Sequence, residues 1–388
     1  MHILEIPSFF PPCGGLFCLD QAKALVALGH EVRILSNVQL GLTVNPRDFW
    51  KLPLGRYEHE MDGITVYQSF QRGLPRLVRH NVERWVNIVC SMYRDYEQQY
   101  GKPDILHAHC AKWAGYAAMK ISARNGVPYV ITDHLPLMLL EDEFGKAPSS
   151  AWQIPLLKQA YEQADMVLPV SEELVNDIAC YYGKNYRWQY LSNTIDTDFY
   201  HYQKRPSREN RPFRFCCLAD YYYRKGYDVL FEALRQLQAQ GLDVELLMAG
   251  FLTDSRECQQ EVERLHLNKV KTYGRIDKNG VRDLLYLSDA LVLASRSEVQ
   301  PLVLLEAMST GIPVVSTECI PQCLRIQDGC TIVPIDDSVK LAEAMCDTIA
   351  HKDCEGEVIS AKVAELASPK VVGQQLEQIF REIIEAKK

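Results

Sequence analysis

The sequence predicts an α/β protein built from two domains, each with a mainly parallel sheet. The chain has 388 residues, which is too long for one ordinary core and suits two domains. Short apolar runs alternate with helical stretches from end to end, as βαβ units require. The alternation lapses between Tyr190 and Arg214, where polar and turn-forming residues predict a linker.

The first domain begins with a complete βαβ unit. Residues 2–6 (HILEI) are a strand, 7–15 (PSFFPPCGG) a loop, and 16–29 (LFCLDQAKALVALG) a helix that Gly29 closes. Further strands are predicted at 31–36 (EVRILS), 105–110 (ILHAHC), 129–134 (YVITDH) and 166–171 (MVLPVS). These elements place the first domain at residues 1–195.

The second domain repeats the pattern. A strand at 213–219 (FRFCCLA) is followed by a helix at 228–241 and by strands at 244–250 (VELLMAG), 312–317 (IPVVST) and 331–335 (TIVPI). The domain therefore spans residues 196–367. Residues 368–388 form a last helix that could pack back across the first domain.

Composition indicates a globular protein and argues against a nucleic-acid partner. Hydrophobic residues make up 47% of the chain, charged residues 24%, and the net charge is −8. The N-terminus resembles no signal peptide, and no run approaches the roughly 18 apolar residues of a spanning helix. We expect a cytoplasmic protein with at most peripheral contact at the inner face of a membrane.

Thirteen cysteines are scattered without a repeating framework, which favours reduced thiols. A zinc site at Cys319, Cys323, Cys330 and Cys354 would need a spacing that these residues do not have.

Residues 69–88 (SFQRGLPRLVRHNVERWVNI) are locally basic. They contain Arg72, Arg76, Arg79 and Arg84, interleaved with apolar and aromatic side chains. One interpretation is a solvated helix face. The alternative is a surface for a phosphorylated or lipid-linked acceptor, or for the membrane itself.

Two glutamates stand eight positions apart in residues 297–317 (SEVQPLVLLEAMSTGIPVVST). Pro301 and Gly311 predict a helix from about Pro301 to Thr310, apolar on nearly every side. A carboxylate at Glu306 is costly there unless it is paired, and a ribose diol could offer it two O–H donors. The alternative is a structural pair with a buried arginine such as Arg275.

Glu298 lies before this helix, at the carboxyl end of the strand ALVLA (290–294). Ligands bind at that edge in open α/β sheets. The adjoining helix N-terminus suits a pyrophosphate because its N–H groups point outward.

The spacing E-x7-E before AMSTGIPVV (307–315) resembles the hallmark of retaining GT-B glycosyltransferases of the nucleotide-sugar-dependent group 1 family. The resemblance covers essentially the whole chain. In family order it includes SFFPPCGGLF (8–17), YVITDH, LPVSEEL (168–174), LSNTIDTDFY (191–200), YYYRKGYDVLFEAL (221–234) and YGRIDKNGVRDLLYLSDALVLAS (273–295). It implies two Rossmann-like βαβ domains facing a central cleft, with acceptor binding in 1–195 and donor binding in 196–367.

The resemblance also implies roles for individual residues. The catalytic set is His134, Lys225 and Glu298, in which Lys225 holds the diphosphate and Glu298 contacts the donor sugar. The donor-binding set is Gly14, Gly15, Arg224, Lys225, Ile276, Glu298, Pro301, Leu302, Val303 and Glu306, the last on the ribose. Structural alternatives are a tight turn at the glycines, a structural His134 and a surface lysine at 225.

The implied reaction moves a sugar with retention from a nucleotide-diphosphate sugar to an acceptor hydroxyl. It needs no cofactor and no metal, so His107 and His109 are interpreted as structural or cleft-lining residues. The partners are the nucleotide sugar and a sugar or lipid-linked acceptor, in polysaccharide or glycolipid biosynthesis.

The sequence departs from the family at the predicted phosphate site. Asp220 stands where an arginine is usual, five residues before Lys225, so either Arg224 takes its place or Asp220 pairs with Arg224. Gln300–Pro301 stand where the family commonly has an aromatic residue and a glycine, and Ile320–Pro321 stand where a glycine pair often faces the sugar.

Three other functions are alternatives to glycosyl transfer. A dinucleotide-dependent dehydrogenase would require G-x-G-x-x-G after the first strand, but the chain has PPCGGLF there. A sugar-nucleotide 2-epimerase shares the GT-B architecture, and a catalytically silent sugar-nucleotide-binding protein would tolerate Asp220.

Overall fold

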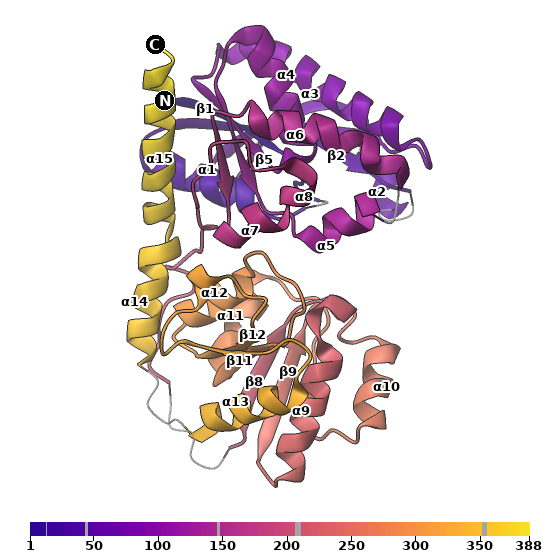
Figure 1. Cartoon of the computed structure of the whole chain (residues 1–388), viewed down its shortest axis with the longest axis vertical. Helices are drawn as coiled ribbons and strands as arrows, with labels where there is room; N and C mark the ends of the chain where they lie inside the picture. Colours follow the sequence, from indigo (N-terminus) through magenta and orange to yellow (C-terminus); the bar gives the residue numbers. More distant parts are fainter. Residues whose placement is uncertain (13, 43–45, 146–147, 206–210, 351–354) are drawn as a thin grey trace. The chain divides into compact units, whose positions relative to one another are not determined.

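A computed structural model describes residues 1–388 except 13, 43–45, 146–147, 206–210 and 351–354. The chain divides into two compact units. Unit 1 comprises Met1–Thr194 and Pro369–Lys388, and unit 2 comprises Ile195–Ser368. Figure 1 labels most of the helices and about half of the strands with the names used below.

Unit 1 contains a seven-stranded sheet in the order β3-β4-β2-β1-β5-β6-β7. All neighbouring strands are parallel except β3 and β4, which form an antiparallel hairpin. The strands are β1 (His2–Pro7), β2 (Glu31–Leu40), β3 (Gly55–Met61), β4 (Ile64–Arg72), β5 (Ile105–His109), β6 (Tyr129–Asp133) and β7 (Met166–Pro169).

Helices cover this sheet. They are α1 (Phe17–Ala27), α2 (Pro46–Lys51), α3 (Val78–Tyr100), α4 (Tyr116–Asn125), α5 (Leu137–Leu140), α6 (Ile154–Glu162), α7 (Glu172–Asp177), α8 (Ala179–Tyr182) and α15 (Pro369–Ala386), with short turns η1 (Ala111–Gly115), η2 (Glu141–Gly145) and η3 (Pro148–Gln153). The C-terminal helix α15 lies beside α1 (Figure 1), and both contribute apolar side chains to one core with β1, β2 and β5.

Unit 2 contains a six-stranded, wholly parallel sheet in the order β10-β9-β8-β11-β12-β13. The strands are β8 (Phe213–Leu218), β9 (Val244–Ala249), β10 (Val270–Thr272), β11 (Ala290–Leu293), β12 (Val314–Thr317) and β13 (Cys330–Val333). The helices are α9 (Tyr227–Ala239), α10 (Arg256–Arg264), α11 (Lys278–Leu287), α12 (Leu302–Ser309), α13 (Ser338–Ala350) and α14 (Gly356–Ala367), with turns η4 (Tyr223–Lys225) and η5 (Gln322–Leu324).

The helices of unit 2 make one core on each face of the sheet. One core joins α9 and α13 to the strands, and the other joins α11, α12 and α14 to them. The predicted α/β class, with two Rossmann-like units, is confirmed.

Two details of the sequence-based assignment were wrong. Residues 69–88 are not one helix face, because Ser69–Arg72 end strand β4 and α3 begins only at Val78. Pro301 precedes α12 as its N-cap, with φ −70° and ψ 110°, so the helix starts at Leu302.

Candidate donor site and its histidine-bearing counterpart

In unit 2 the predicted donor residues follow the carboxyl ends of parallel strands. Asp220 follows β8, Glu298 follows β11, and α12 begins shortly after Glu298. Connections at this edge of an open α/β sheet commonly bind ligands. The contacts of each of these residues therefore indicate whether it could bind a donor.

Glu298 is the centre of a compact charge cluster. Its side chain is only 7% exposed, and it accepts hydrogen bonds from Lys225 Nζ at 2.5 Å and from Ser295 Oγ at 2.7 Å. Arg224 Nη1 lies 3.3 Å from the same carboxylate and also donates to the carbonyl oxygen of Ser297 at 3.0 Å. Two cations thus converge on one buried carboxylate, and an incoming anion could compete with it for them.

Glycine at 226 allows the turn that carries both cations to lie close to β11. Gly226 has φ +64°, and a Cβ there would lie 1.9 Å from the carbonyl oxygen of Ala294. Any side chain would push η4 away from the strand end. In the Lys225–Gly226 pair, the glycine is therefore required by packing, and the lysine supplies the charge.

Arg296, which sequence reasoning missed, clamps the same turn. Its guanidinium forms ion pairs with Asp228 and Asp336 at 2.7 Å, donates to the carbonyl oxygen of Tyr223 at 2.6 Å and lies 4.0 Å from the Tyr223 ring centroid. The hydrogen bonds to Asp228 raise the pKa of Arg296. No motif marks this residue, because its partners in η4, in the first turn of α9 and before α13 are 40 to 73 residues away in the sequence.

Asp220 is anchored to a neighbouring loop. Its carboxylate accepts a hydrogen bond from the backbone N–H of Phe251 at 2.8 Å and so joins the loops after β8 and β9. Arg224 lies beside Glu298, and the described hydrogen bond of Asp220 is to Phe251. Entry of Arg224 into a phosphate site, the first of the two arrangements that the sequence left open, stays a prediction. The unusual aspartate has a structural partner.

Glu306 is half-buried on α12, and its partner is Tyr200. The Tyr200 hydroxyl hydrogen bonds to the Glu306 carboxylate, while burial and then the charge of Glu306 raise the pKa of this tyrosine. Arg275, the alternative partner considered above, is exposed and lies 4.5 Å from the Phe251 ring centroid. Glu306 is thus hydrogen-bonded to a tyrosine, and Arg275 has a different described contact.

The remaining predicted donor residues surround this region. Ile276 packs against the core beside α11 and α12. Pro301 provides no side-chain cap to α12, whose first turn contains Leu302 and Val303. That N-terminus can therefore offer backbone N–H groups to an anion.

In unit 1 the structure brings the glycine loop and His134 together through one ring. A Cβ on Gly15 would lie 2.6 Å from the Phe17 ring, and a Cβ on Gly14 would lie 2.5 Å from the backbone N of Phe10. The Phe17 ring stacks on His134, with centroids 4.8 Å apart. The glycines are therefore needed for a tight turn, and that turn places Phe17 against His134.

His134 is held as a neutral ring. Burial lowers its pKa well below the usual value, and the neighbouring His109 and His107 lower it further. A neutral imidazole can both donate and accept a hydrogen bond. It could thus contact a sugar hydroxyl or a phosphate oxygen without an added charge.

The four arginines of residues 69–88 do not share one surface role. Arg72 and Arg84 are half-buried, with hydrogen bonds to the carbonyl oxygens of Leu52 and Arg72 respectively. Arg76, in the turn before α3, and Arg79, on α3, are exposed. Beside them Leu74, Leu77 and Val78 are exposed by 39–51%. We call Leu74, Arg76, Leu77, Val78 and Arg79 the α3 patch.

The described cysteines are free thiols. Among them Cys319 lies near the donor cluster, with Sγ 3.2 Å from the carbonyl oxygen of Ser295. Cys354 lies outside the described residues. In the described part of the chain, one group has the geometry to hold a metal ion: Glu5, His107 and His109 of unit 1.

Solved structures of other proteins have the same fold. Sucrose-phosphate synthase from Thermosynechococcus elongatus superposes with a TM-score of 0.78 at 17% identity, covering 100% of both chains. Anabaena Alr3699/HepE in complex with UDP superposes with a TM-score of 0.72 at 17% identity, covering 98% of this chain and 100% of that one. At such identities the likeness shows the fold alone, which is that of the GT-B glycosyltransferases.

Sequence comparison places the chain in a family. Residues 212–351 match the family described as Glycosyl transferases group 1, and residues 15–199 match Glycosyltransferase Family 4. The two matches span most of both units, so the chain belongs to the group 1 glycosyltransferases and is a glycosyltransferase. Among curated relatives, the glycosyltransferase TuaC of Bacillus subtilis (strain 168), assigned to teichuronic acid biosynthesis, is 27% identical over 82% of this chain and 81% of its own length.

Within the described residues, none of the helices is both long enough and apolar enough to cross a bilayer.

Proposed function

We propose that this protein transfers a sugar, with retention and without a metal, from a nucleotide-diphosphate sugar to an acceptor hydroxyl in the synthesis of a cell-envelope polysaccharide or glycolipid. The observation that carries the proposal is the cluster in which Arg224 and Lys225 both contact Glu298. A nucleotide donor is supported by Alr3699/HepE, which was solved in complex with UDP. An envelope polymer is supported by TuaC and its assignment to teichuronic acid biosynthesis.

The cluster suggests how a donor would be bound. A diphosphate approaching η4 would compete with Glu298 for Lys225 and Arg224, because both cations prefer the greater negative charge. Glu298 would then be released to accept hydrogen bonds from sugar hydroxyls. The α12 N-terminus and Glu306 would complete the site at the pyrophosphate and the ribose.

The same groups would serve the chemical step. Negative charge grows on the diphosphate as the glycosidic bond breaks, and fixed cations already in contact with it stabilise that charge. Lys225 and Arg224 would supply this field without a metal ion. His134, as a neutral ring, would contact the donor near the departing phosphate.

The test is donor binding and turnover with matched variants. We expect Lys225→Ala and Arg224→Ala each to weaken binding of a nucleoside diphosphate by about ten- to a hundredfold, because each removes a charge-assisted hydrogen bond of about 1.5–3 kcal/mol. Lys269→Ala, which breaks the exposed ion pair with Asp243 in the same unit, is the control and should bind normally. Transfer should persist in excess EDTA.

Two results would contradict the proposal. The donor site would be misplaced if both cation variants bound nucleoside diphosphates as tightly as the control. Loss of transfer in EDTA with recovery on adding manganese would show that a metal, rather than the cations of η4, carries the leaving-group charge. Donor hydrolysis or epimerisation without transfer would favour the alternatives considered above.

The α3 patch is our proposal for the acceptor side. It combines two exposed arginines with three exposed aliphatic side chains on unit 1. Such a surface suits an anionic lipid layer, in which a lipid-linked acceptor would reside, because the arginines pair with headgroups and the aliphatic side chains enter the interface. Peripheral contact of this kind needs no spanning helix.

A further inference from the structure

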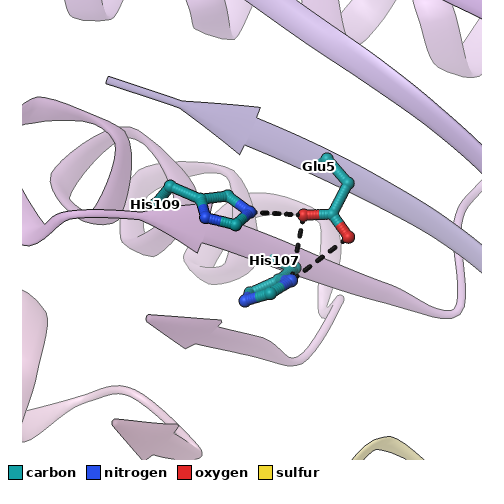
Figure 2. Close-up of side chains that lie close together, drawn as sticks. All are labelled: Glu5, His107 and His109. Carbon is teal, nitrogen blue, oxygen red and sulfur yellow. Dashed lines mark hydrogen bonds and ion pairs between the residues drawn. The ribbon is translucent and has the colours of Figure 1, made fainter. Parts of the chain in front are cut away.

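Glu5 is a carboxylate buried in the middle of strand β1. Its neighbours on β5 are in parallel register, with Glu5 opposite His107 and Pro7 opposite His109. His107 Nδ1 lies 2.9 Å and His109 Nε2 lies 2.8 Å from the carboxylate (Figure 2). All three side chains are buried. The cluster is unusual because a buried charge is expensive unless it is fully hydrogen-bonded.

The hydrogen bonds assign the protons of the cluster. An ionised carboxylate only accepts, so His107 Nδ1 and His109 Nε2 must each carry a proton and donate it to Glu5. His107 Nε2 lies 2.7 Å from the Thr132 hydroxyl, which fixes that ring at its far side. Burial alone would raise the pKa of Glu5, but the charge and hydrogen bonds of the two histidines lower it to about 2.

His109 differs from His107 in having one polar anchor. In the part of the chain that the structure describes, His109 Nδ1 is buried and has no hydrogen-bond partner. The bond from Nε2 to Glu5 is therefore the polar contact that sets the orientation of this ring. The orientation of His109 depends on a residue deep inside the sheet.

The His109 ring in turn supports His134. The two imidazoles are nearly parallel, with an interplanar angle of 6° and centroids 5.8 Å apart. Phe17 stacks on His134 with an angle of 19° and a centroid distance of 4.8 Å. A small rotation of His109 would thus press on His134, because packed rings leave little free space.

We infer that Glu5 and His109 are positioning residues for His134, with Glu5 fixing the His109 ring and His109 fixing the plane of His134. The inference rests on the proposed function, in which His134 contacts the donor. Burial of the His134 ring favours its neutral form. Neither Glu5 nor His109 need touch the substrate.

If Glu5 positions His134, replacing Glu5 should lower the turnover number and leave nucleotide affinity nearly unchanged. Glu5→Gln keeps the shape of the side chain, but its amide nitrogen cannot accept from an imidazole N–H, so one of the two histidines loses its anchor. We expect kcat for transfer to fall by at least about tenfold, as for a modest misplacement of a reacting-site group. The Kd of a nucleoside diphosphate, which the proposed function assigns to unit 2, should change less than about twofold.

The control is Glu60→Gln, an exposed glutamate on β3 of the same unit, with the same change in charge and no expected effect. His109→Phe is a second variant, which retains a flat ring but removes the bond to Glu5, and it should show the same separation. If Glu5→Gln does not fold, as judged by thermal melting, His109→Phe carries the test.

The variant His134→Ala separates a failure of the proposed role of His134 from a failure of the inference about Glu5 and His109. Full activity in His134→Ala would refute the role of His134 in the proposed function, whatever Glu5 does. A large loss in His134→Ala, together with unchanged kcat in folded Glu5→Gln and His109→Phe, would overturn this inference alone. Stoichiometric zinc in the purified protein, lost in Glu5→Gln, would also overturn it, because the cluster would then be a metal site.

Discussion

Tyr200 contacts helix α12 at two positions. Its hydroxyl bonds to Glu306, and its backbone carbonyl oxygen accepts from the Ser309 hydroxyl one turn later. The side chain is 2% exposed, so its orientation is fixed by packing. Glu306 is therefore held before any nucleotide arrives, and less ordering is required on binding.

Tyr200→Phe removes this hydroxyl and little else. We expect nucleoside diphosphate binding to weaken by about three- to tenfold, which corresponds to about 0.7–1.4 kcal/mol of lost preorganisation. Isothermal titration calorimetry gives the Kd directly. Tyr286→Phe is a matched control, because the Tyr286 hydroxyl donates to a backbone carbonyl oxygen, that of His201, in the same unit. Tighter binding in Tyr200→Phe would show instead that the tyrosine competes with the ribose for Glu306.

Asp220 shows why single residues near the donor site were hard to assign from sequence. The motif places it five residues before Lys225, but only the fold brings the Phe251 backbone within 2.8 Å of its carboxylate. Arg296 and Glu5 were missed for the same reason, because their partners are distant in sequence. The cations at 224–225 and the glutamates at 298 and 306 could be selected because local patterns, a Lys-Gly turn and an apolar helix, surround them.

Secondary-structure elements followed local patterns more closely. The helix expected at 301–310 is α12 at Leu302–Ser309, since Pro301 and Gly311 limit it on both sides. The antiparallel pair of β3 and β4 was not predicted, although Asp62–Gly63 between two alternating runs is a hairpin signal. Both residues have positive φ, 49° and 79°, as a tight hairpin turn requires.

The α3 patch lies on the turn before α3 and on the first residues of that helix, and mutation of its arginines tests its role. We expect Arg76→Glu/Arg79→Glu to reduce binding to vesicles containing phosphatidylglycerol by at least about tenfold, because each basic residue near an anionic surface contributes about 1 kcal/mol. Vesicle sedimentation at low and high salt measures the effect, which should shrink as salt screens the charges. Arg79 pairs with Glu83 on the exposed helix surface, so the fold should tolerate the change.

The control for the α3 patch carries an equal change in charge. Arg235→Glu/Arg264→Glu alters two arginines of unit 2 that form similar exposed pairs with nearby glutamates. Equal loss of vesicle binding in both double variants would mean that overall charge, rather than this patch, governs the interaction.

Over the whole chain, alternation of strands and helices was enough to predict two Rossmann-like units, because that pattern is local and repeated. The assignment of the C-terminal helix to a unit depends on packing: α15 shares a core with α1 and the first strands through Leu376 and Phe380. Phe380 also contacts the His107 ring edge-on, with centroids 5.4 Å apart. The end of the chain thus adjoins the buried Glu5 cluster, a relation that no sequence pattern indicated.

The Glu5 cluster gives the protein a predicted sensitivity to acid. The pKa of Glu5 is lowered to about 2, and burial lowers the pKa values of His109 and His134. Each of these groups binds protons more readily in the unfolded chain, so stability falls as the pH drops, below about 6.5 for the histidines and below about 4.5 for Glu5. Asp133 acts in the opposite direction, since burial raises its pKa.

We therefore expect the Tm to fall steadily from pH 7 to pH 3, with the Glu5 contribution on the order of a few kcal/mol. Differential scanning calorimetry across this range tests the slope. In Glu5→Gln the Tm at pH 7 should be lower than in the parent protein, but its decline below about pH 4.5 should be shallower, because the carboxylate that must be protonated is gone. Glu60→Gln should follow the parent curve. Parallel curves for Glu5→Gln and the parent would mean that Glu5 is not ionised in the folded protein, and the assignment of both facing imidazole nitrogens as donors would then be wrong.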